Sequence, residues 1–421
     1  MLNFTLLFLI FITQLSCVRA PLKDRNDALR LSENKFILND DLELKTFVIG
    51  IRESIKRLNE DPESRMMFGP VQIKKGKYAA ALMELLEYIK NISSKNQLYK
   101  YLKENFDFYE VYGQKKWGEV FITSYFDPSI KGSIKPTKEF TQALYKTPQE
   151  MVTINIDKYA EVFPKWSLFA EQVLEQKSRK AIVRGRLISS KNKNNVPEVV
   201  PFYSRKEIDE EKVLKGKNLE IVYVSPIDSF FMQIQGSGII ELPNNKNLRL
   251  GYDSQNGHSY VPIGKHLLDI IPLEEMTLQK IEDYLKTLSA EELQEILNLN
   301  PSYVFFRELE GSSQTYFSTN VIAGRTIATD YGLFPKGALA YLEFKRPIFN
   351  TENSQEPEVW QDTSRFVFDH DTGGAIRGPA RVDLYWGKGS GAKQSAGVMK
   401  QWGRLTYLVP KNISNLHQEL K

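Results

Sequence analysis

The spacing of apolar residues changes along the chain from the period of a helix to the period of a strand. Between residues 41 and 110 the spacing is helical, and one helix face is formed by Leu82, Leu85, Leu86 and Ile89, at i, i+3, i+4 and i+7. From about residue 117, apolar and polar residues alternate in short runs between turn residues, which predicts strands at 120–122, 180–187, 219–224 and 230–235. The polar run 192–195 predicts a loop.

A second helical stretch interrupts the strands. One stripe is marked by Leu278, Ile281 and Leu285, and Ser289 with Glu292 forms a capping box before the next apolar stripe. After 300–301 the strand pattern returns and continues to Pro410. The sequence therefore predicts a mainly β protein with helices in two places. Strands and helices do not alternate as in a dinucleotide-binding fold, and 421 residues suffice for two domains with separate cores.

The first residues have the pattern of a secretory signal. Residues 1–16 carry no charged side chain and are mostly apolar, but they are shorter than the ~20 residues that span a bilayer. We therefore assign 1–20 to a signal segment and 21–40 to a polar leader. Cys17 is the only cysteine, so an internal disulfide is excluded. Two alternatives stay open: lipidation of Cys17, which predicts an outer-membrane lipoprotein, or cleavage after Ala20, which predicts a soluble periplasmic protein.

Charge and motif content exclude several classes of protein. A net charge of +4 without a dense basic run argues against nucleic-acid binding. The four histidines lack metal-ligand spacing, and only His370, beside Asp371, suggests a metal at all. No phosphate loop or nucleophile elbow is present, so Ser237 is not expected to be a nucleophile. We expect no metal and no cofactor, which leaves carboxylates for acid–base chemistry.

Residues 368–391 form the richest candidate segment. In its second half Arg381, Asp383 and Tyr385 share one face of a period-two strand, opposite Val382 and its apolar neighbours. This face could line a cleft, or it could be an exposed strand surface with an Arg381–Asp383 ion pair. Asp371 precedes a Thr-Gly-Gly turn, which suits either an Asx-turn or the close approach of a ligand.

A second candidate lies within residues 225–238. Read as a strand, it places Phe231, Gln233 and Gln235 on one face. Two amides beside an aromatic ring suit the hydroxyl groups of a sugar. They suit cross-strand hydrogen bonds equally well, and the residues alone do not decide between these interpretations.

Six segments in order resemble the membrane-bound lytic murein transglycosylase A family. They span about 120 to 410 and read FITSYFDPSIKGS (121–133), DSFFMQIQGSG (228–238), GYDSQNGHSY (251–260), NPSYVFFRE (300–308), AGRTIATD (323–330) and DTGGAIRGPARVDLYWG (371–387). Each segment is weak alone, but their shared order is specific. The chain departs from the family at 124–126, where Gly-Tyr-Tyr is usual, and at Asp127, where Glu is frequent.

The resemblance implies a fold and a set of site residues. We expect a double-psi β-barrel domain with N-terminal helices from 21–127 and 311–421, an inserted β-rich domain from 128–310, and a substrate groove between them. The three aspartates of the family's C-terminal domain would be Asp330, Asp371 and Asp383. The family's catalytic position matches Asp383, and Asp371 would assist it. The substrate-binding set would be Thr123, Tyr125, Gln233, Gln235, Ser237, Asp330 and Tyr385.

The resemblance also implies a reaction on peptidoglycan glycan strands by a monomer. One carboxyl group would act as acid and then as base, cutting the β-1,4 bond from N-acetylmuramic acid to N-acetylglucosamine and leaving 1,6-anhydro ends. Asp383 then needs a raised pKa, which burial or Asp371 would favour and Arg381 would oppose. Two alternatives remain: an inverting glycoside hydrolase that uses Asp371 and Asp383, and a non-catalytic glycan-binding lipoprotein.

Overall fold

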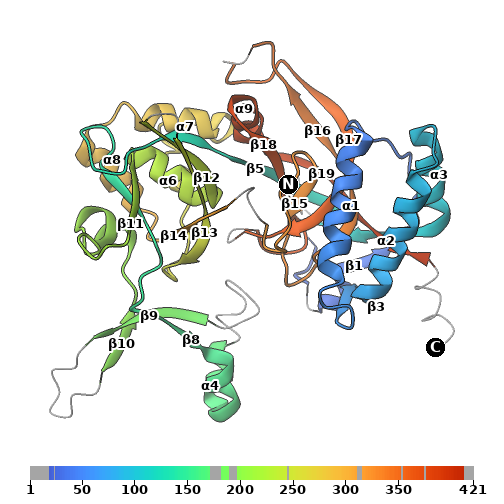
Figure 1. Cartoon of the computed structure of the whole chain (residues 1–421), viewed down its shortest axis with the longest axis horizontal. Coiled ribbons are helices and arrows are strands. Elements are labelled where there is room, and N and C mark those ends of the chain that lie inside the picture. Colours follow the sequence, from blue (N-terminus) through green and yellow to red (C-terminus); the bar gives the residue numbers. More distant parts are fainter. Residues whose placement is uncertain are drawn as a thin grey trace, which may run out of the picture.

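The computed structural model shows two β-rich bodies joined by a long strand (Figure 1). It describes residues 19–22, 24–170, 182–188, 197–243, 246–310, 315–351, 354–373 and 376–411. The apolar run 1–16, Cys17 and the predicted loop 192–195 lie outside the described residues. Among the described helices, none has the length and hydropathy needed to cross a membrane.

The first body is built around a closed barrel of six strands. The strands are β5 (Glu119–Asp127), β15 (Thr326–Ala328), β16 (Ala338–Ile348), β17 (Val359–Asp371), β18 (Arg381–Lys388) and β19 (Gln401–Pro410). They follow the order β19-β16-β17-β15-β18-β5, and β19 also pairs with β5, which closes the ring. The β5–β18 and β15–β17 pairings are parallel and the others antiparallel. This architecture confirms the predicted fold class.

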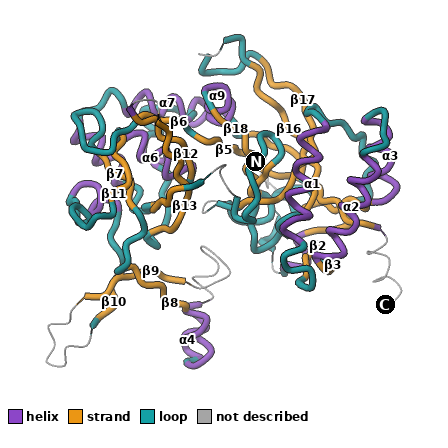
Figure 2. Tube along the Cα trace, viewed as in Figure 1, coloured by secondary structure: helices purple, strands orange, loops and turns teal. Residues whose placement is uncertain are grey.

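Short strands and helices from the first quarter of the chain cover the barrel. Strands β1 (Leu29–Leu31) and β4 (Phe106–Val111) extend the sheet beside β19, and β2 (Arg65–Phe68) pairs with β3 (Val71–Lys74). The helices are α1 (Leu44–Leu58), α2 (Lys75–Ile89) and α3 (Lys95–Asn105), and they gather on one side of the barrel (Figure 2). The predicted stripe of α2 is confirmed, since Leu82, Leu85 and Ile89 are buried and Leu86 packs against the same core.

Close packing of α1 on the barrel depends on a small residue. The helix buries Phe47, Ile51 and Leu58 in the barrel core. A Cβ atom added to Gly50 would lie 2.0 Å from the ring of Phe368 on β17, far inside van der Waals contact. A side chain at position 50 would therefore push the helix away from the strand.

The second body, formed within the predicted insert, has its own small sheets and core. A four-stranded sheet joins β6 (Ser129–Lys131), β12 (Ser237–Leu242), β13 (Lys246–Gln255) and β14 (Val304–Glu308), and β7 (Gln142–Tyr145) pairs with β11 (Glu220–Val224). Helices α6 (Pro226–Gln235), α7 (Leu278–Leu285) and α8 (Ala290–Asn298) pack beside them. The capping box of Ser289 and Glu292 is present at the start of α8, as predicted.

A smaller sheet projects from this second body (Figure 1). It contains β8 (Met151–Asn155), β9 (Ile182–Ile188) and β10 (Glu198–Pro201). Helix α4 (Ile156–Val162) follows β8 directly in the chain. The predicted strands at 180–187 and 219–224 correspond to β9, within its described residues, and to β11.

The predicted strand at 230–235 is wrong, because these residues belong to helix α6. Ser225 caps the helix by accepting a hydrogen bond from the backbone of Asp228, Pro226 occupies the first turn, and Gly236 ends it with a φ of 78°. These three end signals outweigh the short alternation of apolar and polar residues. Consequently Phe231, Gln233 and Gln235 do not share one face, since residues two apart in a helix diverge.

Strand β5 and helix α9 (Ser390–Val398) connect the two bodies. Gln235 accepts a hydrogen bond from the backbone N–H of Phe126 at 3.2 Å. The α9 residue Lys393 forms an ion pair with Glu282 of α7 at 2.7 Å. The predicted boundaries at 127/128 and 310/311 fall at the end of β5 and two residues after β14.

Candidate active site

One face of the β5–β18 pair collects Asp383 and three of the predicted substrate-binding residues. The parallel register sets Arg381 opposite Phe121, Asp383 opposite Thr123, and Tyr385 opposite Tyr125. The residues between them, such as Ile122 and Val382, are buried in the barrel core. Because side chains alternate along a strand, the aspartate, the arginine and their partners lie on the outer face of the barrel.

Asp383 is held by a single side-chain donor. The Thr123 hydroxyl donates to Asp383 Oδ1 at 2.6 Å, and Arg381 Nη2 donates to the same hydroxyl at 3.0 Å. The predicted alternative of a direct Arg381–Asp383 ion pair does not form; the threonine stands between the two charges. Asp383 keeps part of its surface exposed, and no described residue donates a hydrogen bond to its Oδ2 atom.

Burial is the largest influence on the pKa of Asp383. It raises the pKa of this carboxyl group, and the nearby Asp371 adds to the rise, whereas the Thr123 hydrogen bond and Arg381 oppose it. The conflict left open by the sequence is thereby resolved in favour of a raised pKa. A carboxyl group of this kind holds a proton to higher pH than an exposed one and can serve as a general acid.

Asp371, at the end of β17, accepts hydrogen bonds at both oxygens. Tyr125 donates its hydroxyl to Oδ2 at 2.7 Å, and the backbone N–H groups of Tyr316 and Thr372 donate to Oδ1 at 2.9 Å each. Burial raises the pKa of Asp371, and these three donors counteract the rise. Burial and the Asp371 charge raise the pKa of Tyr125 well above its usual range, so its hydroxyl stays a donor.

A buried lysine that the sequence analysis missed braces the end of β17. Lys336 pairs with Asp369 at 2.6 Å and donates to the Asp371 carbonyl oxygen at 2.7 Å. The hydroxyls of Thr329 and Tyr407 both donate to Asp369 Oδ2 at 2.6 Å. In the sequence Lys336 follows a proline in a turn and looks like a solvated charge; only the tertiary fold reveals its partners.

Other predicted site residues have structural partners. Asp330 accepts from the backbone of Gly332 and Gly378 at 2.9 Å each, which ties two loops together. Gln233 is buried inside the insert. Ser237 donates to buried Asp127 at 2.6 Å, where the bodies meet. Tyr385 is buried with its ring 5.1 Å from that of Tyr125.

The structure thus brings Thr123, Tyr125, Asp371, Asp383 and Tyr385 into one cluster. It places Gln233 elsewhere and gives the Asp330 carboxylate a bracing role. His370 is fully buried and shares a 2.7 Å hydrogen bond with Ser54, and burial lowers its pKa to about 3. Across the described ranges, no group of three or more His, Cys, Asp or Glu side chains is arranged to hold a metal ion.

The fold and the cluster together define a barrel protein with a carboxylate pair suited to acid–base chemistry. Comparison with known proteins specifies the family. The family model of the MltA-specific insert domain matches residues 121–307, and that of the 3D domain matches residues 325–409. The chain belongs to the membrane-bound lytic murein transglycosylase A family.

Relatives and solved structures agree with this assignment. The chain is 28% identical over 306 residues to membrane-bound lytic murein transglycosylase A of Escherichia coli K12, covering 72% of this chain and 69% of that protein. It is 30% identical over 210 residues to the Vibrio cholerae protein of the same name, covering 47% and 54%.

Two crystal structures share the fold. A membrane-bound lytic murein transglycosylase from Agrobacterium tumefaciens has a TM-score of 0.68 at 24% identity, covering 90% of this chain and 95% of that one. E. coli MltA with bound chitohexaose has a TM-score of 0.64 at 21% identity, covering 93% and 96%.

Proposed function

We propose that this protein is a peptidoglycan lytic transglycosylase in which Asp383 is the acid and then the base. The observation that carries the proposal is a partly exposed aspartate with a raised pKa, one hydrogen-bond donor and one oxygen that accepts no bond from the described residues. Relatives are named lytic murein transglycosylases, and one solved neighbour holds chitohexaose.

In the first step the Asp383 proton moves to the glycosidic oxygen as the bond from C1 of N-acetylmuramic acid breaks. Positive charge then develops at C1 and the ring oxygen, as in other glycoside cleavages. In the second step the 6-hydroxyl of the same sugar attacks C1, and its proton returns to Asp383. The product is a 1,6-anhydro ring, and no water is consumed.

An internal nucleophile removes the need for a second catalytic carboxylate. The attacking hydroxyl belongs to the sugar that carries C1, so the step benefits from intramolecular proximity. Both oxygens of Asp371 already accept hydrogen bonds. This supports a positioning and electrostatic role for Asp371 and argues against its activating a water, as an inverting hydrolase would require.

Mass spectrometry of digested peptidoglycan tests the reaction. Purified wild-type protein should release fragments with 1,6-anhydromuramoyl ends, one water lighter than reducing ends, and chelator should leave the rate unchanged. The full-length Asp383→Asn variant is the matched control and should release almost none. Reducing ends alone would favour the inverting hydrolase, and binding without products would favour the glycan-binding lipoprotein.

The proposal extends to the cell envelope. Relatives are named membrane-bound, which agrees with envelope association. We propose a periplasmic protein held at the outer membrane through an acyl group on Cys17. Labelled palmitate should enter the wild type in a bacterial host and not Cys17→Ser. A wild type without label would be a soluble periplasmic protein instead.

A further inference from the structure

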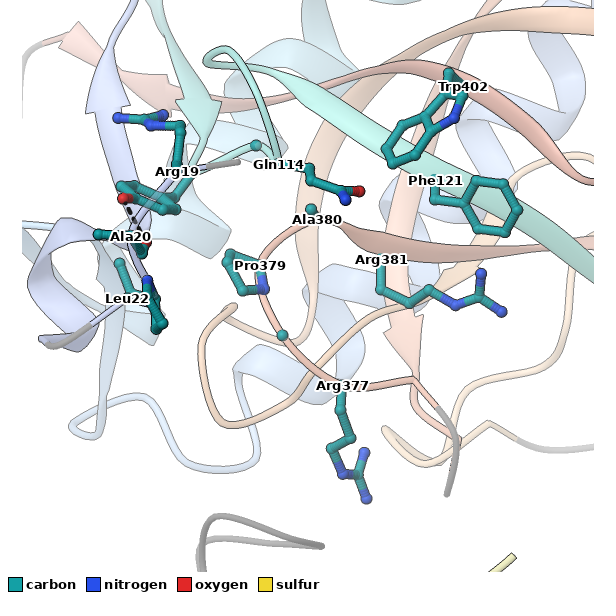
Figure 3. A pocket seen from close by; sticks show the side chains of 14 residues that line it. Arg19, Ala20, Leu22, Gln114, Phe121, Arg377, Pro379, Ala380, Arg381 and Trp402 are labelled. Carbon is teal, nitrogen blue, oxygen red and sulfur yellow. Dashed lines mark hydrogen bonds between the residues drawn. The ribbon is translucent and has the colours of Figure 1, made fainter. Parts of the chain in front are cut away.

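A hollow of about 510 Å³ lies beside the β5–β18 pair, at Phe121 and Arg381. Its walls come from residues 19–22, 112–114 and 377–381, together with Phe121 of β5 and Trp402 of β19 (Figure 3). Phe121 and Arg381 are paired in register, two residues before Thr123 and Asp383 on the same strand faces. At ~3.3 Å per residue along a strand, the hollow begins about 7 Å from Thr123 and Asp383.

The charge of the hollow has one sign. Arg377 and Arg381 line it, Arg19 joins them in a chain cleaved before Cys17, and no aspartate or glutamate is among its lining residues. Arg19 stacks on the ring of Tyr112 at 3.9 Å, and Arg377 donates to the carbonyl oxygens of Gly373 and Ile376 at 2.8 Å each. These contacts hold both arginines in the walls of the hollow.

Arg381 has no carboxylate partner among the described residues. Its guanidinium donates to the Thr123 hydroxyl and forms no ion pair with any residue that the structure describes. The Phe121 ring lies 5.1 Å from the guanidinium carbon, and Trp402 lies beside Phe121 at 5.2 Å. The rings therefore hold a partly buried, planar donor group at the edge of the hollow. The N–H donors of a planar guanidinium match the two oxygens of a carboxylate.

We propose that the hollow is a subsite for a carboxylate carried by the glycan strand. This inference rests on the proposed function. A strand bound across Asp383 continues along β5 and β18 into the hollow. There Arg381 meets a carboxylate of a muramoyl unit, which is the free lactyl group where the peptide is absent and a carboxylate of the peptide where it is attached. The site would distinguish peptidoglycan from uncharged chito-oligosaccharides, which offer sugar rings without an anion.

A binding comparison in the full-length Asp383→Asn background tests the subsite, because the ligands then stay uncut. The ligands are soluble glycan strands with peptides, the same strands with peptides removed, and chitohexaose. Arg381→Gln should weaken binding of the strands that carry the recognised carboxylate by about 10- to 100-fold, the usual value of hydrogen bonds to charged groups. Chitohexaose affinity should change by less than about twofold. The lactyl carboxyl group is an amide wherever a peptide is attached, so a loss confined to the peptide-bearing strands assigns the peptide carboxylates, and a loss confined to the peptide-free strands assigns the free lactyl group.

Two further variants control for indirect effects. Trp402→Ala removes a wall that is 47% exposed and does not touch the Thr123–Asp383 bond, and it should cause a smaller loss of the same selectivity. Arg52→Gln removes an exposed charge on α1 and should change nothing. Equal losses for charged and uncharged ligands, or no loss, would overturn the subsite.

The result also separates this inference from the function on which it rests. Anhydro products from the wild type without ligand selectivity would leave the function and remove the subsite. Selective binding without products would leave the subsite and remove the function. Sedimentation with anionic phospholipid vesicles provides the remaining comparison. If Arg381→Gln reduces only vesicle binding, the hollow is a lipid-headgroup site and the proposal is wrong.

Discussion

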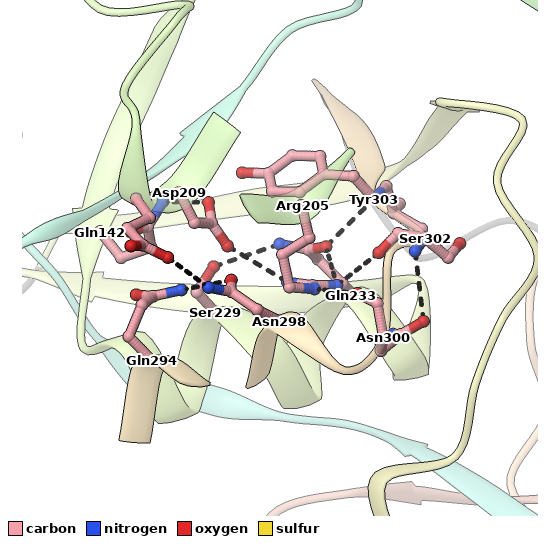
Figure 4. Close-up of polar contacts among 12 residues, drawn as sticks. Gln142, Arg205, Asp209, Ser229, Gln233, Gln294, Asn298, Asn300, Ser302 and Tyr303 are labelled. Carbon is pink, nitrogen blue, oxygen red and sulfur yellow. Dashed lines mark hydrogen bonds and ion pairs between the residues drawn. The ribbon is translucent and has the colours of Figure 1, made fainter. Parts of the chain in front are cut away.

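A cluster in the insert and a cluster in the barrel each contain an arginine and a carboxyl group of raised pKa, but they differ in how fully their hydrogen bonds are made. In the insert, Arg205 donates to Asn300 O at 2.9 Å, Asp209 at 3.3 Å, and both Gln233 and Ser302 O (Figure 4). In the barrel, Arg381 reaches one threonine hydroxyl and no carboxylate of the described residues.

Exposure distinguishes the clusters further. Arg205 and Asp209 are almost wholly buried, and burial raises the pKa of Asp209 to about 6. Asp383 has a pKa raised by the same cause, yet it stays partly exposed with one donor. A raised pKa is therefore common to a structural cluster and to the cluster proposed as catalytic. The two differ in hydrogen bonding and exposure, and a partly exposed carboxyl group with one donor is the better candidate to exchange a proton with a substrate.

We call the barrel cluster of Asp383 the open cluster and the insert cluster of Arg205 the complete cluster. The largest expected effect comes from changing Asp383 in the open cluster. Asp383→Asn keeps the shape of the side chain but cannot release or regain a proton. General acid–base catalysis contributes ~10²–10⁴-fold, so the initial rate on peptidoglycan should fall at least that far. Pull-down on insoluble peptidoglycan and a melting curve should match the wild type. A folded variant with near-normal turnover would remove the proposed catalyst, and joint loss of binding and melting temperature would assign Asp383 a structural role.

Breaking the complete cluster should affect folding more than chemistry. Asp209→Ala leaves Arg205 buried without its counter-ion, and removing one partner of such a pair costs about 3–5 kcal/mol. We expect denaturant unfolding of the insert at much lower concentration, with ordinary turnover in the protein that stays folded. The exposed Asp269→Ala is the matched control and should change stability by less than about 0.5 kcal/mol. Equal stability of the two variants would show that the pair has no structural role.

Local patterns predicted the open cluster better than the complete one. The alternation of Arg381, Asp383 and Tyr385 is a property of one strand, and it placed all three on a shared face before any tertiary contact was known. The family resemblance then supplied Thr123 and Tyr125, whose contacts with Asp383 and Asp371 the structure contains.

The complete cluster joins residues far apart in sequence, so no local pattern could assemble it. Gln233 was placed on a strand with a sugar-binding role, whereas it lies in helix α6 and accepts from Arg205. Ser225 and Gly236 are local helix signals in this segment, and they determine its structure although the short alternation predicts a strand. The Lys336–Asp369 pair was missed for the same reason as Arg205–Asp209, because burial of a charge depends on distant segments.

Asp371→Asn should lower turnover less than Asp383→Asn does, because Asp371 is proposed to position and tune the catalyst. Turnover should fall by about tenfold, the value of one lost interaction of roughly 1.4 kcal/mol, well short of the Asp383→Asn loss. Burial is the main cause of the raised pKa of Asp383, and the Asp371 charge adds to it. Removing that charge lowers the Asp383 pKa. The high-pH limb of the rate profile, where the acid loses its proton, should move to lower pH; a shift upward would contradict the assignment.

Thr123→Val should move the same limb in the opposite direction, with the smallest loss of rate. The Thr123 hydroxyl is the only described donor to Asp383 and stabilises its charged form, so it lowers the pKa that burial raises. Without it the Asp383 pKa rises further, and the acid keeps its proton to higher pH. Turnover should fall only about three- to tenfold, the value of one ordinary hydrogen bond. Thr123→Ser retains the donor and should keep the wild-type profile. Opposite shifts in Thr123→Val and Asp371→Asn would tie the limb to Asp383, whereas matching shifts would assign it to another group.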